Sequence, residues 1–190
     1  MINDFVINPI EILDLFKDID SSLRKLNFMK KEKGELKRKL TNKDWYILNY
    51  AIDNINYSMK AIKYCLRNGI GKKQATKYLK LYGLIGAINI QQNAIAEIYK
   101  ILRKDYTVKK DIIQICNRLI LQPLNSDENG FCYTISSYVD DYMVSVVEFN
   151  VDKQKEKELD PTTKYRQITV KHLKELNLCL KKFLDVYFYP

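Results

Sequence analysis

Residues 72–104 constrain the fold more than any other part of the chain, because their apolar side chains recur at the spacing of one long helix. The expected buried side carries Tyr78, Leu81, Ile85, Ile88, Ala94, Ile98 and Leu102. Gly83 and Gly86 interrupt this helix, where each glycine costs about 1 kcal/mol relative to alanine. The pair therefore predicts a close approach of another helix at this point.

Four other segments have the same helical spacing. The first begins at Pro9, with Asn8 as its cap, and fades toward Gly34. The second is capped by Thr41 or Asn42 and is ended by Asn68-Gly69. Another begins near Val108 and stops before Pro123, and the last runs from Leu173 to about Tyr187. Six Gly and four Pro in the whole chain are too few for many short strands, so long helices are favoured.

A change in amino-acid composition after residue 130 predicts one small β-hairpin. Residues 131–139 and 142–150 are rich in β-branched and aromatic side chains, and Asp140-Asp141 separates them. Residues 152–163 are charged and are expected to form a loop. The predicted fold is mostly α, an antiparallel bundle of four to five helices with this hairpin, in a single domain over residues 1–190. Its expected parts are an N-terminal helix with a basic connection at 1–40, a helical core at 42–123, the hairpin at 131–150 and a C-terminal helix at 168–188.

The positive charge is concentrated in one block of the sequence. The formal net charge is +9, and residues 30–110 alone carry nineteen Lys/Arg against six Asp/Glu. Such a block favours a polyanionic partner, although a lysine-rich surface can also serve solubility alone. The candidate nucleic-acid contacts are Lys37, Arg38, Lys39, Lys63, Arg67, Lys72, Lys73, Lys77, Lys80 and Arg118. Tyr64 and Tyr78 lie among them and could stack on bases, or could be core or interface groups.

Metal and cofactor chemistry finds no support in the sequence. The four cysteines form no CxxC pair, and His172 is the only histidine, so a zinc site is not expected. No phosphate-binding glycine motif occurs, and no cofactor is expected. His172 lies at the start of the expected last helix, where we expect an exposed side chain rather than a catalytic one. Without a signal peptide or an apolar run of membrane-spanning length, the chain is expected to be cytoplasmic with reduced thiols.

One block of the sequence resembles bacterial helical proteins of the HEPN superfamily, a group named for nucleotide binding in higher eukaryotes and prokaryotes. A Tyr-Leu-x-Leu-Tyr-Gly run followed by paired glutamines carries the resemblance, which continues in residues 115–123 and covers roughly residues 42–188. The matching positions in the first block are Tyr78, Leu79, Leu81, Tyr82, Gly83, Gln91 and Gln92.

The resemblance implies a metal-independent ribonuclease that works as a homodimer, with an arginine for the phosphate and a histidine for proton transfer. This chain has Cys116 at the arginine position and Gln122 at the histidine position, and only the polar Asn117 fits. A glutamine amide can hydrogen-bond a phosphate or a base, but it cannot shuttle protons. Arg118 lies about 200° round the helix from Cys116 and faces elsewhere. The resemblance therefore indicates a catalytically degenerate site.

The resulting interpretation is a degenerate HEPN-like module that binds RNA or another nucleotide, or that regulates a partner. The family analogy suggests a setting in phage defence or in a system like a toxin and its antitoxin. Two alternatives stay open: an active ribonuclease with a rearranged site, and a protein–protein interaction module without a nucleic-acid ligand. A homodimer is expected, a protein partner is possible, and no membrane association is expected.

Overall fold

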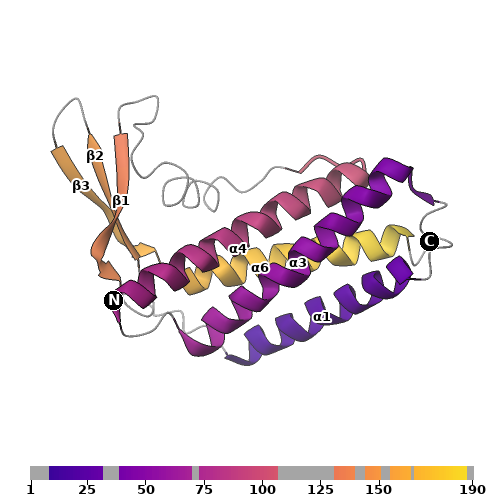
Figure 1. Ribbon diagram of the computed structural model, residues 1–190, viewed down its shortest axis with the longest axis horizontal. Coiled ribbons are helices and arrows are strands. Elements are labelled where there is room, and N and C mark those ends of the chain that lie inside the picture. The colour runs from indigo at the N-terminus through magenta and orange to yellow at the C-terminus, as the bar shows by residue number, and fades with distance from the viewer. Residues whose placement is uncertain are drawn as a thin grey trace. The chain divides into compact units, whose positions relative to one another are not determined.

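The fold, seen in a computed structural model, is mostly α-helical (Figure 1). The structure describes residues 9–31, 39–69, 73–106, 131–139, 144–150, 155–163 and 165–187. Its helices are α1 (Pro9–Lys31), α3 (Asn42–Asn68), α4 (Gln74–Ile101) and α6 (Tyr165–Tyr187). Its strands are β1 (Phe131–Val139), β2 (Val144–Asn150) and β3 (Lys155–Thr163). The prediction of a mostly α bundle is confirmed, while the helix expected at 108–122 lies outside the described residues.

The two ends of α3 form as their sequence signals predict. The hydroxyl oxygen of Thr41 accepts a hydrogen bond of 3.1 Å from the backbone N–H of Asp44, and the Thr41 hydroxyl donates to the Asp44 carboxylate at 2.7 Å. This reciprocal pair satisfies backbone and side-chain groups at the N-terminus of the helix. At the other end Gly69 has a φ of 64°, the left-handed conformation that glycine adopts at low cost after a helix.

Helix α4 ends in the same kind of turn, but without a glycine. The backbone N–H of Lys104 donates to the carbonyl of Tyr99 at 3.1 Å, and that of Arg103 donates to the carbonyl of Lys100 at 2.9 Å. These two bonds make a Schellman motif, which places Arg103 in the left-handed region with a φ of 53°. A non-glycine residue there is strained.

The chain separates into two compact units. Unit 1 comprises residues 1–58, 90–107 and 170–190, and unit 2 comprises residues 59–89 and 108–169. Helices α3, α4 and α6 contribute residues to both units.

Unit 1 contains a bundle built from α1, α3, α4 and α6, whose relative directions follow from their contacts. Lys30 pairs with Asp53, and Asn27 contacts Asn56, so α3 runs antiparallel to α1. Glu11 pairs with Lys174 and Asp18 with Lys181, which makes α6 parallel to α1. The bundle is therefore not antiparallel throughout.

The core of unit 1 is made of aliphatic and aromatic side chains at helical spacing on each helix. Ile19, Ile55, Ile98 and Phe183 have no exposed surface, and each comes from a different helix. Helix α6 begins at Tyr165, about two turns earlier than the sequence predicts, so its buried side starts at Thr169 rather than at Leu173. The early start places His172 well inside the helix instead of at its start.

Unit 2 contains the C-terminal turns of α3, the N-terminal half of α4 and a three-stranded antiparallel sheet with the order β1-β2-β3. Phe131 is the register partner of Asn150 between β1 and β2, and Asn150 is the partner of Lys155 between β2 and β3. The sequence predicts a loop over 152–163 from its charge, but β3 occupies most of this range. Charged residues are common on an edge strand, since they oppose further pairing, and the edge position also accommodates Pro161.

Among the described residues, no helix makes the close approach predicted at Gly83 and Gly86. A Cβ atom added at either glycine would meet none of their atoms within 4 Å, and Gly83 is exposed. Both glycines lie on the outer side of α4, and the buried side is formed by residues such as Leu81, Leu84 and Ile88.

Candidate functional site

A buried polar network in unit 1 joins the paired glutamines of α4 to the only histidine of the chain. The side chains of Gln91, Gln92 and His172 are 0–1% exposed. Nε2 of His172 lies 2.8 Å from Oε1 of Gln91, and Nδ1 lies 2.7 Å from Nε2 of Gln92. The Gln91 amide also donates to the backbone carbonyl of Ile55 on α3 at 3.5 Å. Three helices are therefore connected through one imidazole.

The partners of Gln92 determine which ring nitrogen of His172 carries the proton. Nε2 of Gln92 donates to a carboxylate oxygen of Glu175 at 3.2 Å, and its Oε1 accepts from the hydroxyl of Tyr106 at 2.9 Å. With the amide held this way, its N–H group faces Nδ1 of His172, which must act as an acceptor. Nε2 then carries the proton and donates to Gln91. The arrangement fits a neutral imidazole in one tautomer.

Tyr106 and Cys179 lie beside this network and are held in their neutral forms. Burial raises the pKa of Tyr106 well above its ordinary value of 10.0, and the negative charge of Glu175 raises it further. Burial likewise raises the pKa of the Cys179 thiol to about 12. The ring of Tyr106 stacks on that of Tyr99 with centroids 4.7 Å apart. These features describe a rigid interior network rather than a reactive thiol or phenol.

The expectation that His172 is exposed is wrong. Because α6 begins at Tyr165, residue 172 falls inside the helix and on its buried side. Both ring nitrogens are engaged by glutamine side chains, and no ring atom reaches solvent. A general acid or base must reach its substrate directly or through one water. The histidine is placed to hold helices together, not to transfer protons to a ligand.

A second feature is a cationic region on the two helical segments of unit 2. Residues 54–96 contain seven Lys/Arg and no Asp/Glu, so the acidic residues nearest in sequence are Asp53 and Glu97. Arg67 and Lys73 are exposed, while Lys63, Lys77 and Lys80 are partly buried. Lys60, which the charge pattern did not single out, is also exposed on α3. We call residues 59–68 of α3, and residues 73–89, which are Lys73 and the first part of α4, the basic helical segments.

The basic helical segments contact each other around Lys80. The Nζ atom of Lys80 lies 5.0 Å from the centre of the Tyr64 ring and donates to the carbonyl of Gly69 at 3.5 Å. Tyr64 is 53% exposed, so it is not a core residue. The thiol of Cys65 is buried and donates to the carbonyl of Lys80 at 3.7 Å. The cation and the aromatic ring are thus held together at the surface of unit 2.

The remaining predicted site residues fall into two groups. Lys39 belongs to unit 1, where it is exposed and donates to the backbone carbonyl of Tyr187 at 3.4 Å. The structure does not describe the others, which include all three positions of the degenerate catalytic motif. These others are Lys37, Arg38, Lys72, Cys116, Asn117, Arg118 and Gln122.

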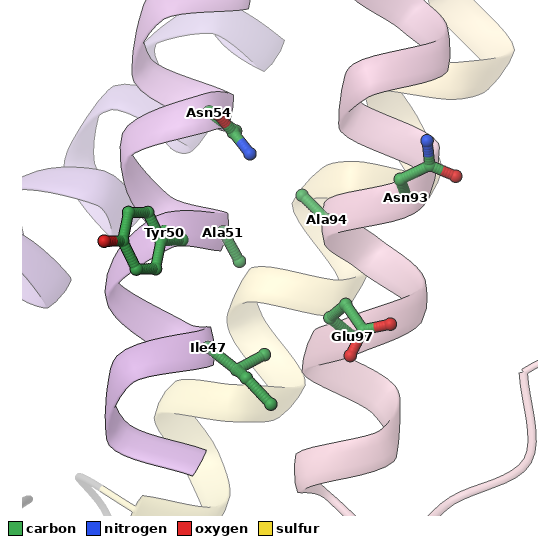
Figure 2. Close-up of a pocket in the computed structure, with 7 residues that line it drawn as sticks. All are labelled: Ile47, Tyr50, Ala51, Asn54, Asn93, Ala94 and Glu97. Carbon is green, nitrogen blue, oxygen red and sulfur yellow. The ribbon is translucent and has the colours of Figure 1, made fainter. Parts of the chain in front are cut away.

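A shallow groove lies between α3 and α4 in unit 1, where no sequence motif indicates a site. Its volume is about 230 Å³, which is below the range typical of drug-sized ligands. Figure 2 shows that Ile47 and Ala51 of α3 point toward α4 and that Ala94 of α4 points toward α3, whereas the ring of Tyr50 points away from α4. Asn54, Asn93 and Glu97 complete the lining. Small and apolar side chains form its inner part, and amide, phenol and carboxylate groups surround them. Only the pairing of two helices brings this set together.

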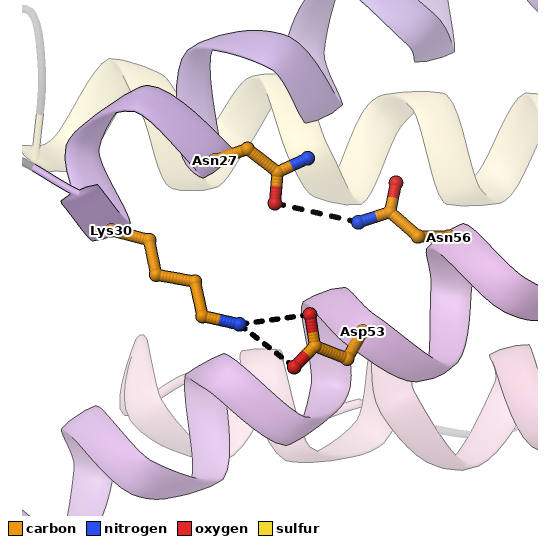
Figure 3. A network of polar contacts seen from close by, with 4 residues as sticks. All are labelled: Asn27, Lys30, Asp53 and Asn56. Carbon is orange, nitrogen blue, oxygen red and sulfur yellow. Dashed lines mark hydrogen bonds and ion pairs between the residues drawn. The ribbon is translucent and has the colours of Figure 1, made fainter.

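Acidic side chains next to this part of α3 and α4 are neutralised by lysines. Lys30 of α1 donates to both carboxylate oxygens of Asp53 at 2.8 and 2.7 Å, beside a 3.4 Å contact between Asn27 and Asn56 (Figure 3). Lys100 pairs with Glu97 one turn away on α4 at 2.5 Å. These partly exposed pairs add little stability, but they cancel the local negative charge.

The part of the chain that the structure describes contains no candidate metal site, no disulfide and no membrane-spanning helix. No group of three or more His, Cys, Asp or Glu side chains there could hold a metal ion. Cys65 and Cys179 are buried free thiols. None of the described helices has an apolar stretch long enough to cross a bilayer.

The chain matches no protein-family model, and no curated protein and no solved structure is similar enough to it to count as a match. The resemblance to the HEPN superfamily therefore stays a prediction.

Proposed function

We propose that this chain is a non-catalytic, HEPN-like module that binds RNA through the basic helical segments. The observation that carries the proposal is the acid-free run of residues 54–96, in which six of the seven cations lie on two contacting segments that the structure describes. Lysine and arginine side chains release counterions when they neutralise phosphates, which gives sequence-independent affinity. An architecture of helices with a hairpin at 131–150, and a role in phage defence or in a toxin–antitoxin setting, belong to the same proposal.

The burial of His172 supports binding rather than cleavage. Cleavage by the HEPN mechanism uses an accessible histidine, and this chain has a single histidine whose ring nitrogens are both engaged. The motif position that would hold a histidine carries Gln122. An amide can contact a phosphate or a base without transferring a proton.

A homodimer is part of the proposal. In unit 2, Leu79 is 74% exposed and Tyr82 is 39% exposed on the outer side of α4, next to the open space beside Gly83. An exposed apolar stripe on a helix is typical of an interface. Light scattering at tens of micromolar is expected to give twice the 22.5 kDa of one chain, and a mass near 22.5 kDa would contradict this expectation.

The RNA proposal is tested with two matched double variants. Arg67→Gln/Lys73→Gln removes two exposed cations of the basic helical segments, and Lys43→Gln/Lys104→Gln removes two exposed cations of unit 1. Each pair lowers the net charge by the same amount. Single-stranded RNA binding is measured at several salt concentrations for both variants.

The first variant is expected to bind more weakly, with a salt slope reduced by about 0.7 for each phosphate that the protein no longer neutralises. The second is expected to bind like the wild type. Equally weakened binding in both variants would mean that net charge alone attracts RNA, and the assignment to the basic helical segments would then be abandoned.

A further inference from the structure

Tyr64 is an aromatic side chain on the outer side of the basic helical segments, within unit 2. The buried side of α3 in this unit is formed by Met59, Ile62, Cys65 and Leu66. At about 100° per residue, Tyr64 lies on the opposite side of the helix, and 53% of it is exposed. The helical spacing therefore presents the ring to a ligand rather than to the core.

The ammonium group of Lys80 is fixed beside this ring by contacts on both helical segments. Its Nζ atom lies 5.0 Å from the centre of the Tyr64 ring and donates to the carbonyl of Gly69 at 3.5 Å. The backbone carbonyl of Lys80 accepts from the buried thiol of Cys65 at 3.7 Å. The cation therefore supports the ring before any ligand binds, and such preorganisation lowers the entropic cost of binding.

Arg67 provides a second cation next to the ring. Residues three positions apart on a helix have Cβ atoms about 5–6 Å apart, so Arg67 is a surface neighbour of Tyr64. Arg67 is exposed, and it has no acidic partner among the described residues. A guanidinium group can hold a phosphate through two parallel hydrogen bonds. We call the side chains of Tyr64, Arg67 and Lys80 the Tyr64 surface.

The charge around the Tyr64 surface favours a polyanion. Residues 59–89 all belong to unit 2 and carry seven Lys/Arg and no Asp/Glu, so the ring and the cations lie in the same unit. An acidic protein would also satisfy the cations. The exposed ring adds a platform for stacking, and a nucleic acid offers a planar base together with each phosphate. Cations combined with stacking rings are typical of proteins that bind single strands.

We propose that the Tyr64 surface binds an unpaired nucleotide of single-stranded RNA. The base stacks on the face of the Tyr64 ring opposite Lys80, and a neighbouring phosphate contacts Arg67. This proposal rests on the RNA-binding function proposed above, and it specifies single strands as the substrate class. The ring accepts any base, because every base has a π face, whereas bases within a duplex are already stacked and are not available.

The test compares three single variants in binding to short fluorescent oligo(U) and to an RNA duplex. Tyr64→Leu removes the ring but keeps apolar bulk beside Lys80, and Tyr64→Phe keeps the ring. Tyr50→Leu is the matched control, because Tyr50 is 71% exposed on the part of α3 that belongs to unit 1. Tyr64→Leu is expected to weaken oligo(U) binding about five- to a hundredfold, since stacking on one ring contributes about that factor. The other two variants are expected to bind within twofold of the wild type.

Two readouts separate stacking from charge. Because Tyr64 contacts no phosphate in this proposal, Tyr64→Leu should leave the salt slope of oligo(U) binding unchanged. It should also leave duplex binding unchanged, because the ring acts only on unpaired bases. A reduced salt slope, or an equal loss of duplex binding, would contradict the proposed stacking.

The outcomes distinguish this inference from the proposed function. If the wild type binds oligo(U) and Tyr64→Leu binds it equally well, the Tyr64 surface is not the base site, and the RNA-binding function still stands. If the wild type binds neither RNA, the proposed function and this inference are both overturned. An equal loss of oligo(U) binding in Tyr64→Phe or in Tyr50→Leu would show an effect other than stacking on this ring and would overturn the inference alone.

Discussion

The Nδ1 atom of His172 lies 2.7 Å from the Nε2 atom of Gln92, and this contact fixes the proton on the other ring nitrogen. Glu175 and Tyr106 hold the Gln92 amide in the orientation that makes it a donor toward the ring. The neutral histidine in turn donates to Gln91. A chain of oriented polar groups thus links α4 and α6 in the interior of unit 1, where each unsatisfied group would be expensive.

Replacing either member of this pair is expected to be destabilising and strongly non-additive. Gln92→Leu and His172→Leu should each lower the free energy of unfolding by about 2–4 kcal/mol, because each leaves buried partners unpaired. The double variant should cost much less than the sum of the two. Urea unfolding of the four proteins measures the coupling, and strictly additive costs would mean that the two side chains do not interact.

The thiol of Cys179 is expected to react very slowly in the folded protein. Burial raises its pKa to about 12 from the ordinary 9.0, so almost no thiolate is present at pH 8. The contribution of this thiol to the free energy of unfolding is fully present below about pH 9, and it is lost as the pH rises toward 12. Peptide mapping after iodoacetamide treatment at pH 8 should find Cys179 unmodified in the folded chain and modified in urea. Rapid modification in the folded chain would contradict its burial.

The ion pair between Asp18 and Lys181 predicts a small, pH-dependent contribution to stability. Hydrogen bonds from Lys181 and Asn177 lower the pKa of Asp18 below its ordinary value of 3.8. The contribution is therefore present above pH 3.8 and is lost as the pH falls through the lowered value.

Because both partners of this pair are half exposed, Asp18→Asn should cost less than about 1 kcal/mol at pH 7. The cost should disappear in acid. Asp14→Asn is the matched control, since its partner Lys17 lies on the same helix. Thermal unfolding at several pH values measures both variants, and a pH-independent cost for Asp18→Asn would contradict the prediction.

Substitutions at the two left-handed residues, Arg103 after α4 and Gly69 after α3, are expected to change the free energy of unfolding in opposite directions. Arg103→Gly should raise the free energy of unfolding by roughly 0.5–1 kcal/mol, because glycine relieves the strain of a φ of 53°. Gly69→Ala should lower it by about 1 kcal/mol, since alanine is strained at a φ of 64°. Chemical denaturation measures the free energy of unfolding of both variants. A change in the same direction for both would show that these backbone angles do not determine the effect of the substitutions.

The sequence predicted the helices that carry a clear local signal. The apolar spacing located α1, α3 and α4 within a few residues, and Thr41 and Gly69 marked the ends of α3. Such signals lie within a few residues of the element they define. The start of α6 was placed too late because Tyr165–Val170 carries neither a cap nor a clear apolar stripe.

The environment of His172 could not be predicted from the residues around it. Its partners Gln91 and Gln92 are about 80 positions away on another helix, so nothing local shows that the ring is buried. The groove between α3 and α4 is missed for the same reason, since its lining residues come together only when the two helices pack. The glycines of α4 led to a prediction that the described residues do not bear out. Small residues predict a close helix approach whether or not a partner helix is present.

The central claim is that the chain binds RNA and leaves it intact. The most direct measurement is a native gel of the purified protein with labelled single-stranded and hairpin RNA, without metal, at low and moderate salt, followed by a denaturing gel of the same samples. The account predicts shifted RNA at low salt, loss of the shift at moderate salt, and full-length RNA in the denaturing gel. Cut RNA, or RNA that stays unshifted at low salt, would contradict it.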